Sequence, residues 1–177
     1  MYFELNLNEY HMPLTSDDSL LFRKASDADY KKIVRDIYPL LNGYGKKDKK
    51  YLKHPNKYTV FISEKENRVI HYFLVFEDPI NSPLTQTPIF KDIIGKDSAY
   101  LGSAFTVPDE RGIWITTYSV SFILNFLKQN TDIKKIILLV HNKTPGAIQF
   151  FKRLGFNIIP NAAPSNVLKW LLYKIRP

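Results

Sequence analysis

Apolar and polar positions in the first part of the chain repeat with two different periods. A short apolar run over residues 20–24 predicts a strand, and Ser26 followed by Asp29 has the pattern of a helix N-cap with a capping box. Apolar residues then recur at helical spacing over residues 33–41, which predicts a helix with one buried stripe. Pro39 is expected to end or kink this helix.

The next part of the chain changes from a polar helix to strands. The lysine-rich residues 46–53 predict a second, polar helix, and the apolar runs 58–63 and 69–76 predict a β-hairpin. Residues 78–97 contain three prolines and predict a long loop, and such loops in compact domains are usually functional or flexible. Residues 98–107 predict a further strand.

Helices and strands continue to alternate in the second half. The expected elements are a turn over 108–112, a helix over 116–128, a buried strand over 136–140, a helix from Thr144-Pro145 to a C′ glycine at Gly155, and closing strands over 156–159 and 168–175. This order predicts an α/β fold, in which a central mixed β-sheet is flanked by about four helices.

Composition sets the domain organisation. The polar, acidic start predicts an N-terminal extension over residues 1–18, and residues 19–177 then form a single domain. The chain has no cysteine, which excludes disulfides, a thiolate nucleophile and cysteine-ligated zinc, and its four histidines lack metal-ligand spacing. No segment has a signal-peptide pattern or the ~20 apolar residues of a membrane helix. These features favour a cytoplasmic protein without a metal or a membrane partner.

The net charge of +8 favours anionic partners such as phosphorylated cofactors, acidic peptides or nucleic acid. Six lysines from Lys46 to Lys57 are interleaved with Tyr44, Tyr51 and Tyr58, a composition that suits an RNA-binding groove and equally a solvated helix face. The solvated face is the simpler interpretation. The RNA groove stays open as an alternative.

Two segments carry a resemblance to a known family. Phe105-Thr106-Val107-Pro108-Asp109-Glu110-Arg111-Gly112 resembles the strand, turn and phosphate loop of GNAT (GCN5-related) acyltransferases, and Ala147 to Phe156 resembles the alanine-led second signature that ends in Leu-Gly-Phe. With its flanking strands the resemblance covers residues 20–175. It implies the GNAT fold and transfer of an acetyl group, or a longer acyl chain, from acetyl-coenzyme A to a primary amine.

The resemblance also implies where the co-substrate binds. A diphosphate suits a turn whose backbone N–H groups converge at a helix N-terminus, and Arg111 adds a positive charge there. Trp114 and Thr116 replace small family residues, and Thr144 replaces an asparagine whose amide Asn142 could supply. The expected cofactor-binding residues are Phe105, Thr106, Val107, Arg111, Gly112, Ile113, Trp114, Ile115, Thr116, Asn142, Thr144 and Phe151.

Catalytic groups are harder to assign. Phe151 stands where the family often has a tyrosine that protonates the leaving thiolate, and phenylalanine cannot donate a proton. The strand 98–107 contains no carboxylate, so the candidate bases are Glu77 and Tyr100, with Asp78 and Asp97 as further candidates.

The leading hypothesis is therefore a GNAT-type N-acetyltransferase, monomeric or homodimeric, that acts by direct attack of an unknown amine acceptor, either a small molecule or a peptide. Two alternatives stay open. One is a catalytically impaired binding or sensor module with the same fold. The other is an RNA-directed enzyme, such as an aminoacyl-tRNA acetyltransferase, that uses the lysine and tyrosine segment.

Overall fold

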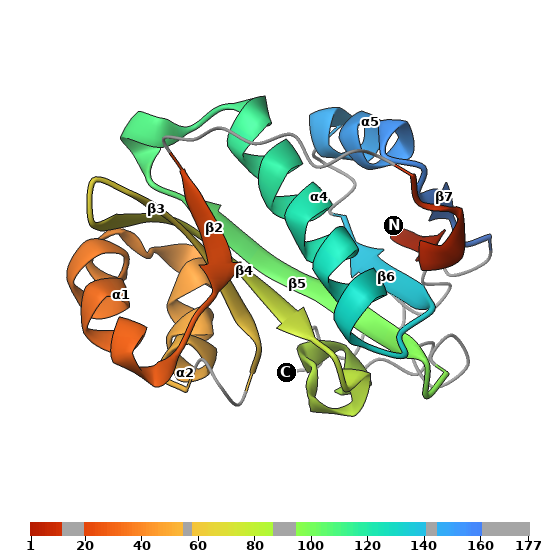
Figure 1. The fold of residues 1–177 in the computed structure, drawn as a ribbon, viewed down its shortest axis with the longest axis horizontal. Helices are drawn as coiled ribbons and strands as arrows, with labels where there is room; N and C mark the ends of the chain where they lie inside the picture. Colours follow the sequence, from red (N-terminus) through yellow and green to blue (C-terminus); the bar gives the residue numbers. More distant parts are fainter. Residues whose placement is uncertain (12–19, 55–57, 87–94, 141–144, 161–177) are drawn as a thin grey trace, which may run out of the picture.

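One seven-stranded mixed sheet organises the molecule (Figure 1). The computed structural model describes residues 1–11, 20–54, 58–86, 95–140 and 145–160. The strand order is β2-β3-β4-β5-β6-β1-β7. The strands are β1 Tyr2–Asn6, β2 Leu21–Lys24, β3 Val60–Lys65, β4 Arg68–Phe76, β5 Ser98–Thr106, β6 Lys135–Leu139 and β7 Asn157–Ile158. All described pairs are antiparallel except β5–β6, so the predicted mixed sheet is confirmed.

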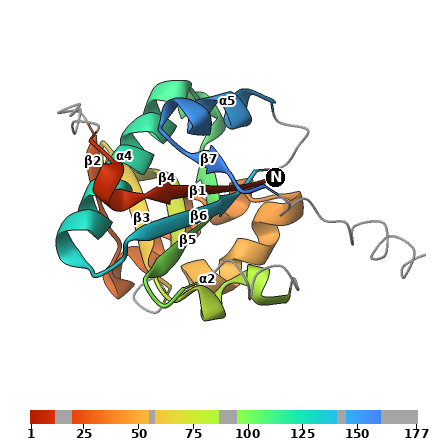
Figure 2. The ribbon, with the colours of Figure 1, turned by 90° about the vertical axis from the view of Figure 1, so that its right-hand side faces the viewer.

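Four α-helices flank the described sheet, as the sequence pattern predicts: α1 Tyr30–Asp36, α2 Lys49–Leu52, α4 Ile113–Asn130 and α5 Pro145–Arg153. Figure 2 shows α4 and α2 on opposite sides of the sheet. The core is correspondingly divided into two clusters, one that includes Ile33, Ile37 and Leu52 from the α1–α2 region and one that includes Ile123 and Leu127 from α4.

The local signals at the ends of the helices are confirmed with small differences. The Ser26 N–H donates to an Asp29 carboxylate oxygen (2.8 Å), as the capping box requires. Pro39 lies in a separate 3-10 turn, Tyr38–Leu40, after α1 has ended. Gly155 has φ +89°, the left-handed conformation expected of a C′ glycine. Helix α4 begins at Ile113 rather than at Thr116, directly after the extended Gly112.

The N-terminal residues differ from the prediction. The polar pattern predicts an extension over residues 1–18, but Tyr2–Asn6 form β1, which lies inside the sheet between β6 and β7. Phe3 is completely buried and Leu5 nearly so. The acidic side chain misled the prediction because alternation in a strand puts Phe3 and Leu5 on one face, in the core, and Glu4 on the other face, where it stays partly exposed.

The predicted closing strand over 168–175 lies outside the described residues, as do residues 87–94 of the predicted loop over 78–97. Among the described residues, no helix combines the length and the hydropathy that are needed to cross a bilayer.

Candidate functional site

The parallel strands β5 and β6 pair only along the first half of β5, because β6 ends at Leu139 while β5 continues to Thr106. We call the point where the pairing ends the fork, and it is the centre of the site. The two strands pair only from Ser98 opposite Lys135 to Leu101 opposite Leu138. On its other side, β5 has an irregular register with β4 between Phe73 and Val75. A bulge of this kind bends a strand away from its neighbour. The half of β5 beyond Leu101 is consequently the more exposed half.

The exposed half of β5 has backbone groups that β6 does not pair. The Val107 N–H donates to the Ile70 carbonyl on the β4 side (2.9 Å). Backbone groups in an antiparallel ladder point alternately toward and away from the partner strand. Those of Phe105 therefore face β4, whereas those of Ala104 and Thr106 face the opening left by β6. We call this edge, from Gly102 to Thr106, the open edge of β5; it can pair with an extended amide-containing ligand.

The N-terminus of the long helix α4 follows the open edge after one short turn, Pro108–Glu110. Its N-cap is Gly112, and glycine has no side-chain oxygen to cap the amides of the first turn. An anionic ligand can therefore accept from these amides and interact favourably with the helix dipole. The structure thus leaves the backbone of the predicted diphosphate loop available.

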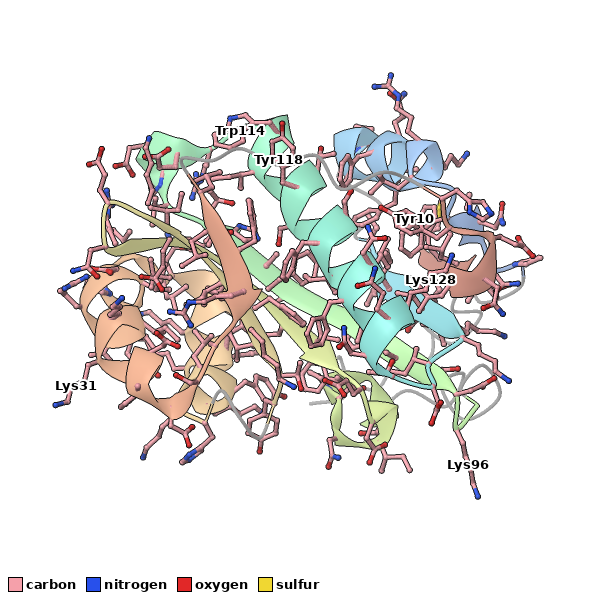
Figure 3. All side chains as sticks on the ribbon, in the orientation of Figure 1. Tyr10, Lys31, Lys96, Trp114, Tyr118 and Lys128 are labelled. Atoms are coloured by element: carbon pink, nitrogen blue, oxygen red, sulfur yellow. The ribbon has the colours of Figure 1, made fainter. Side chains whose placement is uncertain are left out.

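Trp114 lies beside this helix start without acting as a cap. Its ring is T-shaped against Tyr118, one turn further along α4, with a centroid distance of 5.9 Å, and Figure 3 shows the two residues together at the N-terminal end of the helix. A Cβ built on Gly112 would lie 3.0 Å from Trp114 Cδ1. The ring therefore rests directly on Gly112 and narrows the approach to the loop, while the indole remains 40% exposed.

Arg111 lies between the helix start and the open edge. Its Nε donates to the Thr106 carbonyl (3.2 Å), and its guanidinium carbon lies 5.8 Å from the centre of the Phe105 ring. The side chain is exposed, so its charge is accessible to a ligand. Arg111 covers one carbonyl of the open edge but none of its N–H groups.

The other expected cofactor-binding residues differ in how accessible they are to a ligand. Val107 and Ile115 are fully buried and Thr116 is half-buried. Because the Val107 N–H already donates to the Ile70 carbonyl, only Ile115 of the two buried residues can offer a backbone donor. Ile113 begins α4. Asn142 and Thr144 lie outside the described residues, and their expected roles remain predictions.

A cleft of about 500 Å³ opens on the α1–α2 side of the fork. Its lining comes from the 3-10 helix Gly43–Asp48, from β4 and from the open edge of β5: Asn42, Gly43, Gly45, Asp48, Tyr72, Ser103, Ala104, Phe105 and Arg111. Among these described lining residues, Asp48 alone carries a carboxylate. The cleft and the open edge therefore meet at Ser103 and Phe105.

Asp48 is buried, with 6% of its surface exposed. The Tyr72 hydroxyl donates to Asp48 Oδ2 at 2.8 Å, and the Tyr72 ring stacks on Phe105 at 6.1 Å. Burial raises the pKa of Asp48 above its usual value, although hydrogen bonds from Tyr72 and Ser103 partly oppose this shift. The pKa of Tyr72 is raised in turn by burial and by the neighbouring carboxylate.

The expected bases Glu77 and Tyr100 lie on the paired side of the fork. The Thr59 hydroxyl donates to a Glu77 carboxylate oxygen (2.9 Å), and Lys24 also contacts it. Tyr100 is buried and stacks on Phe76 at 5.9 Å, and burial raises the pKa of its hydroxyl. Neither residue lines the cleft. Their catalytic roles remain predictions.

The two further carboxylates serve turns. Asp78 accepts from the Ile80 N–H (3.1 Å) and from the Asn81 side chain (3.0 Å). Asp97 lies immediately before β5, and its backbone carbonyl accepts from the Lys134 N–H (2.8 Å). Both are exposed, so each resembles a solvated end of a strand.

Phe151 is a packing residue of α5. Its ring lies edge-on to Phe150 at 5.0 Å and to Phe156 at 5.4 Å, and it packs against the core on the α4 side. These contacts agree with its helical spacing.

The lysine and tyrosine segment is less suited to stacking nucleic-acid bases than its composition indicates. Tyr51 is buried and lies edge-on to Phe76 at 5.2 Å. The Lys49 and Lys50 ammonium groups lie over the rings of Tyr38 and Tyr51, at 4.9 and 4.5 Å. These rings are engaged within the protein, which weakens the RNA alternative. Within the described residues no group of three His, Cys, Asp or Glu side chains could hold a metal ion.

Asp48 is the site residue that the sequence analysis missed. It lies in the middle of the lysine run, where a single aspartate is expected to be a solvated partner of its neighbours. The available signal was the helical spacing of Asp48, Tyr51 and Leu52, all of which are buried.

Comparisons with known proteins identify the fold. No family model matches the chain, and no curated protein matches it in sequence. Solved structures do match. A possible acetyltransferase from Clostridium difficile 630 is 15% identical with a TM-score of 0.55, covering 80% of this chain and 93% of that one.

Two further matches have named activities. The GCN5-related glucosamine N-acetyltransferase region of a fungal multi-domain β-N-acetylglucosaminidase is 15% identical with a TM-score of 0.61, covering 88% of this chain and 19% of that one. A ribosomal-protein-alanine N-acetyltransferase from Brucella melitensis biovar Abortus 2308 is 8% identical with a TM-score of 0.51, covering 76% of this chain and 89% of that one. The chain therefore has the GNAT fold, in agreement with the sequence resemblance.

Proposed function

We propose that this chain, which has the GNAT fold, is an N-acetyltransferase that transfers an acetyl group from acetyl-coenzyme A to a primary amine. The observation that carries the proposal is the open edge of β5 beside the uncapped start of α4. These two features provide, in one place, donors for the amides of an extended arm and donors for a diphosphate.

The order of these features along the chain sets the direction in which the substrate would bind. The diphosphate would accept from the first-turn amides of α4, near Gly112, with Arg111 as a nearby cation. The arm would then run back along the open edge, past the N–H groups of Thr106 and Ala104. Its acyl end would reach the fork beyond Leu101, where the cleft opens.

The acceptor amine would enter through this cleft and attack the thioester carbonyl directly. Backbone N–H groups of the open edge would polarise the carbonyl oxygen as negative charge develops on it. Since Phe151 cannot protonate the leaving thiolate, the proton would come from the attacking nitrogen or from water. We include a cytoplasmic location in this proposal.

Calorimetric titration with acetyl-coenzyme A tests the proposal most directly. We expect binding, and we expect Arg111→Glu to weaken it by about tenfold to a hundredfold, because a charge-assisted contact becomes repulsive. Arg153→Glu is the matched control, since it reverses the same charge in the last turn of α5, away from the fork.

The outcomes separate the hypotheses. Absence of heat and of a thermal shift at millimolar acetyl-coenzyme A would contradict the proposal and leave a binding or sensor module for another ligand. Equal losses of affinity for acetyl-coenzyme A in Arg111→Glu and Arg153→Glu would show a general effect of charge rather than a diphosphate site.

A further inference from the structure

Asp48 is held at the point where the cleft meets the fork. It closes the 3-10 helix Gly43–Asp48, and the Tyr72 hydroxyl from β4 fixes its carboxylate at 2.8 Å. Ser103, in the irregular part of β5 just beyond the last pair with β6, also hydrogen-bonds to it. Three separate elements therefore direct this carboxylate toward the place where the strands part.

The surroundings of Asp48 suit a group that exchanges protons. A carboxylate has about four acceptor positions, so bonds from Tyr72 and Ser103 leave room for a further donor. Burial without a direct ion pair makes the charged form less stable and the carboxylate more basic. A base is most effective when its pKa approaches the working pH, and burial raises the pKa of Asp48 toward that pH.

We propose that Asp48 is the general base of the reaction, which takes the proton from the acceptor ammonium in the cleft. This inference rests on the proposed acetyl transfer. The ammonium N–H transfers its proton to Asp48, and the neutral nitrogen attacks the thioester carbonyl carbon. The C–S bond then breaks, the thiolate takes the second proton lost by the nitrogen, and the products are an amide and coenzyme A thiol, with one proton left on Asp48.

The charged and titratable groups around Asp48 are compatible with this role. Tyr72 and Tyr100 are buried phenols with raised pKa values, so both remain neutral over the range in which a carboxylate ionises. Lys50 lowers the pKa of Asp48 through space, and Arg111 lines the same cleft. No other carboxylate contributes to the described lining of the cleft, so an incoming ammonium has Asp48 as its acidic partner there.

The test measures release of coenzyme A thiol from acetyl-coenzyme A with a panel of alkyl primary amines and, separately, with hydroxylamine. Alkyl amines are protonated at neutral pH and need a base, whereas hydroxylamine is mainly neutral. We expect Asp48→Asn to lower kcat/KM for the alkyl amines by about a hundredfold or more at pH 7. The loss should shrink as the pH rises and should be much smaller with hydroxylamine.

A second variant keeps the test informative if Asp48→Asn does not fold. Tyr72→Phe keeps the ring on Phe105 but removes the hydrogen bond that holds down the pKa of Asp48. We expect the acidic limb of its pH–rate profile to move to higher pH. Asp36→Asn is the matched control, because Asp36 has a similarly buried carboxylate, with a side chain 7% exposed, and lies outside the cleft.

The results distinguish this inference from the proposed function. If acetyl-coenzyme A does not bind in the calorimeter, the proposed function fails. If it binds but the wild type acetylates no amine of the panel at any pH, the proposed acetyl transfer fails and the assignment of Asp48 fails with it. The assignment is also overturned if Asp48→Asn loses activity equally with alkyl amines and hydroxylamine, or if Tyr72→Phe leaves the acidic limb unchanged.

Discussion

At the scale of single residues, buried polar side chains organise the site. His71 is 1% exposed, and its Nδ1 and Nε2 lie 2.8 Å from Thr106 Oγ1 and 3.1 Å from Ser119 Oγ. It therefore links β4 to the open edge of β5 and to α4. His71 is a strand residue of β4 that is almost completely enclosed.

Burial lowers the pKa of His71 to about 4, compared with 6.5 for a free histidine. Between these values the unfolded chain binds more protons than the folded chain, so the free energy of unfolding must fall as the pH falls. We expect this residue to contribute a loss of about 2 kcal/mol between pH 7 and pH 5.

Urea unfolding of the wild type and of His71→Gln at both pH values measures this contribution. The variant should be less stable at pH 7, and the difference between the two proteins should narrow at pH 5. If the free energies of unfolding of the two proteins changed in parallel with pH, the prediction would be contradicted, because all other titrating groups are common to both proteins.

At the scale of elements, a strand irregularity and a turn determine the local geometry. The irregular register in β5 coincides with the end of its pairing with β6, so the exposed Ser103 lies where the open edge begins. The hairpin from β3 to β4 turns through Glu66 and Asn67, with φ values of +49° and +63°. Positive φ at both central residues is the type I′ pattern, which favours Asn-Gly.

We therefore expect Glu66→Asn combined with Asn67→Gly to stabilise the protein by about 1 kcal/mol, because residues with a Cβ are strained in the left-handed region. Thermal and urea unfolding measure the gain. Glu66→Gln controls for loss of charge and should leave stability nearly unchanged. A destabilised double variant would show that the turn is held by contacts of the Glu66 side chain.

At the scale of the whole molecule, the N-terminal strand completes the sheet. The β1 strand pairs with β6 over Tyr2–Asn6 and with β7 at Phe3 and Glu4. The terminal amine donates to the Val140 carbonyl (2.9 Å), and burial lowers its pKa. Without β1, the strand β7 would have no partner among the described strands.

Phe3→Ala should therefore destabilise the protein by about 3–5 kcal/mol, the usual cost of emptying a buried phenylalanine site. Leu21→Ala on the edge strand β2 is the control, since Leu21 is 55% exposed and its loss should change stability by less than about 0.5 kcal/mol. Urea unfolding measures both. If Phe3→Ala were as mild as Leu21→Ala, residues 1–6 would behave as the extension that the polar pattern predicts.

The sequence alone determined what depends on near neighbours along the chain. Apolar periodicity identified α1, α4, α5 and the strands β2 to β6, because each element must place its apolar residues on one face. Ser26 and Gly155 marked the ends of helices because capping and left-handed backbone are local requirements. The two signature segments indicated the GNAT fold, which the solved structures share.

Only the tertiary structure decided what depends on segments that meet from far apart. The fork exists because β5 continues beyond the end of its partner β6, and no single strand carries that information. Strand β1 enters the sheet because a gap beside β6 accepts a short amphipathic strand that the polar pattern hides. Asp48 becomes a buried, directed carboxylate because Tyr72 and Ser103 reach it from other strands, and its own lysine-rich neighbourhood predicts the opposite.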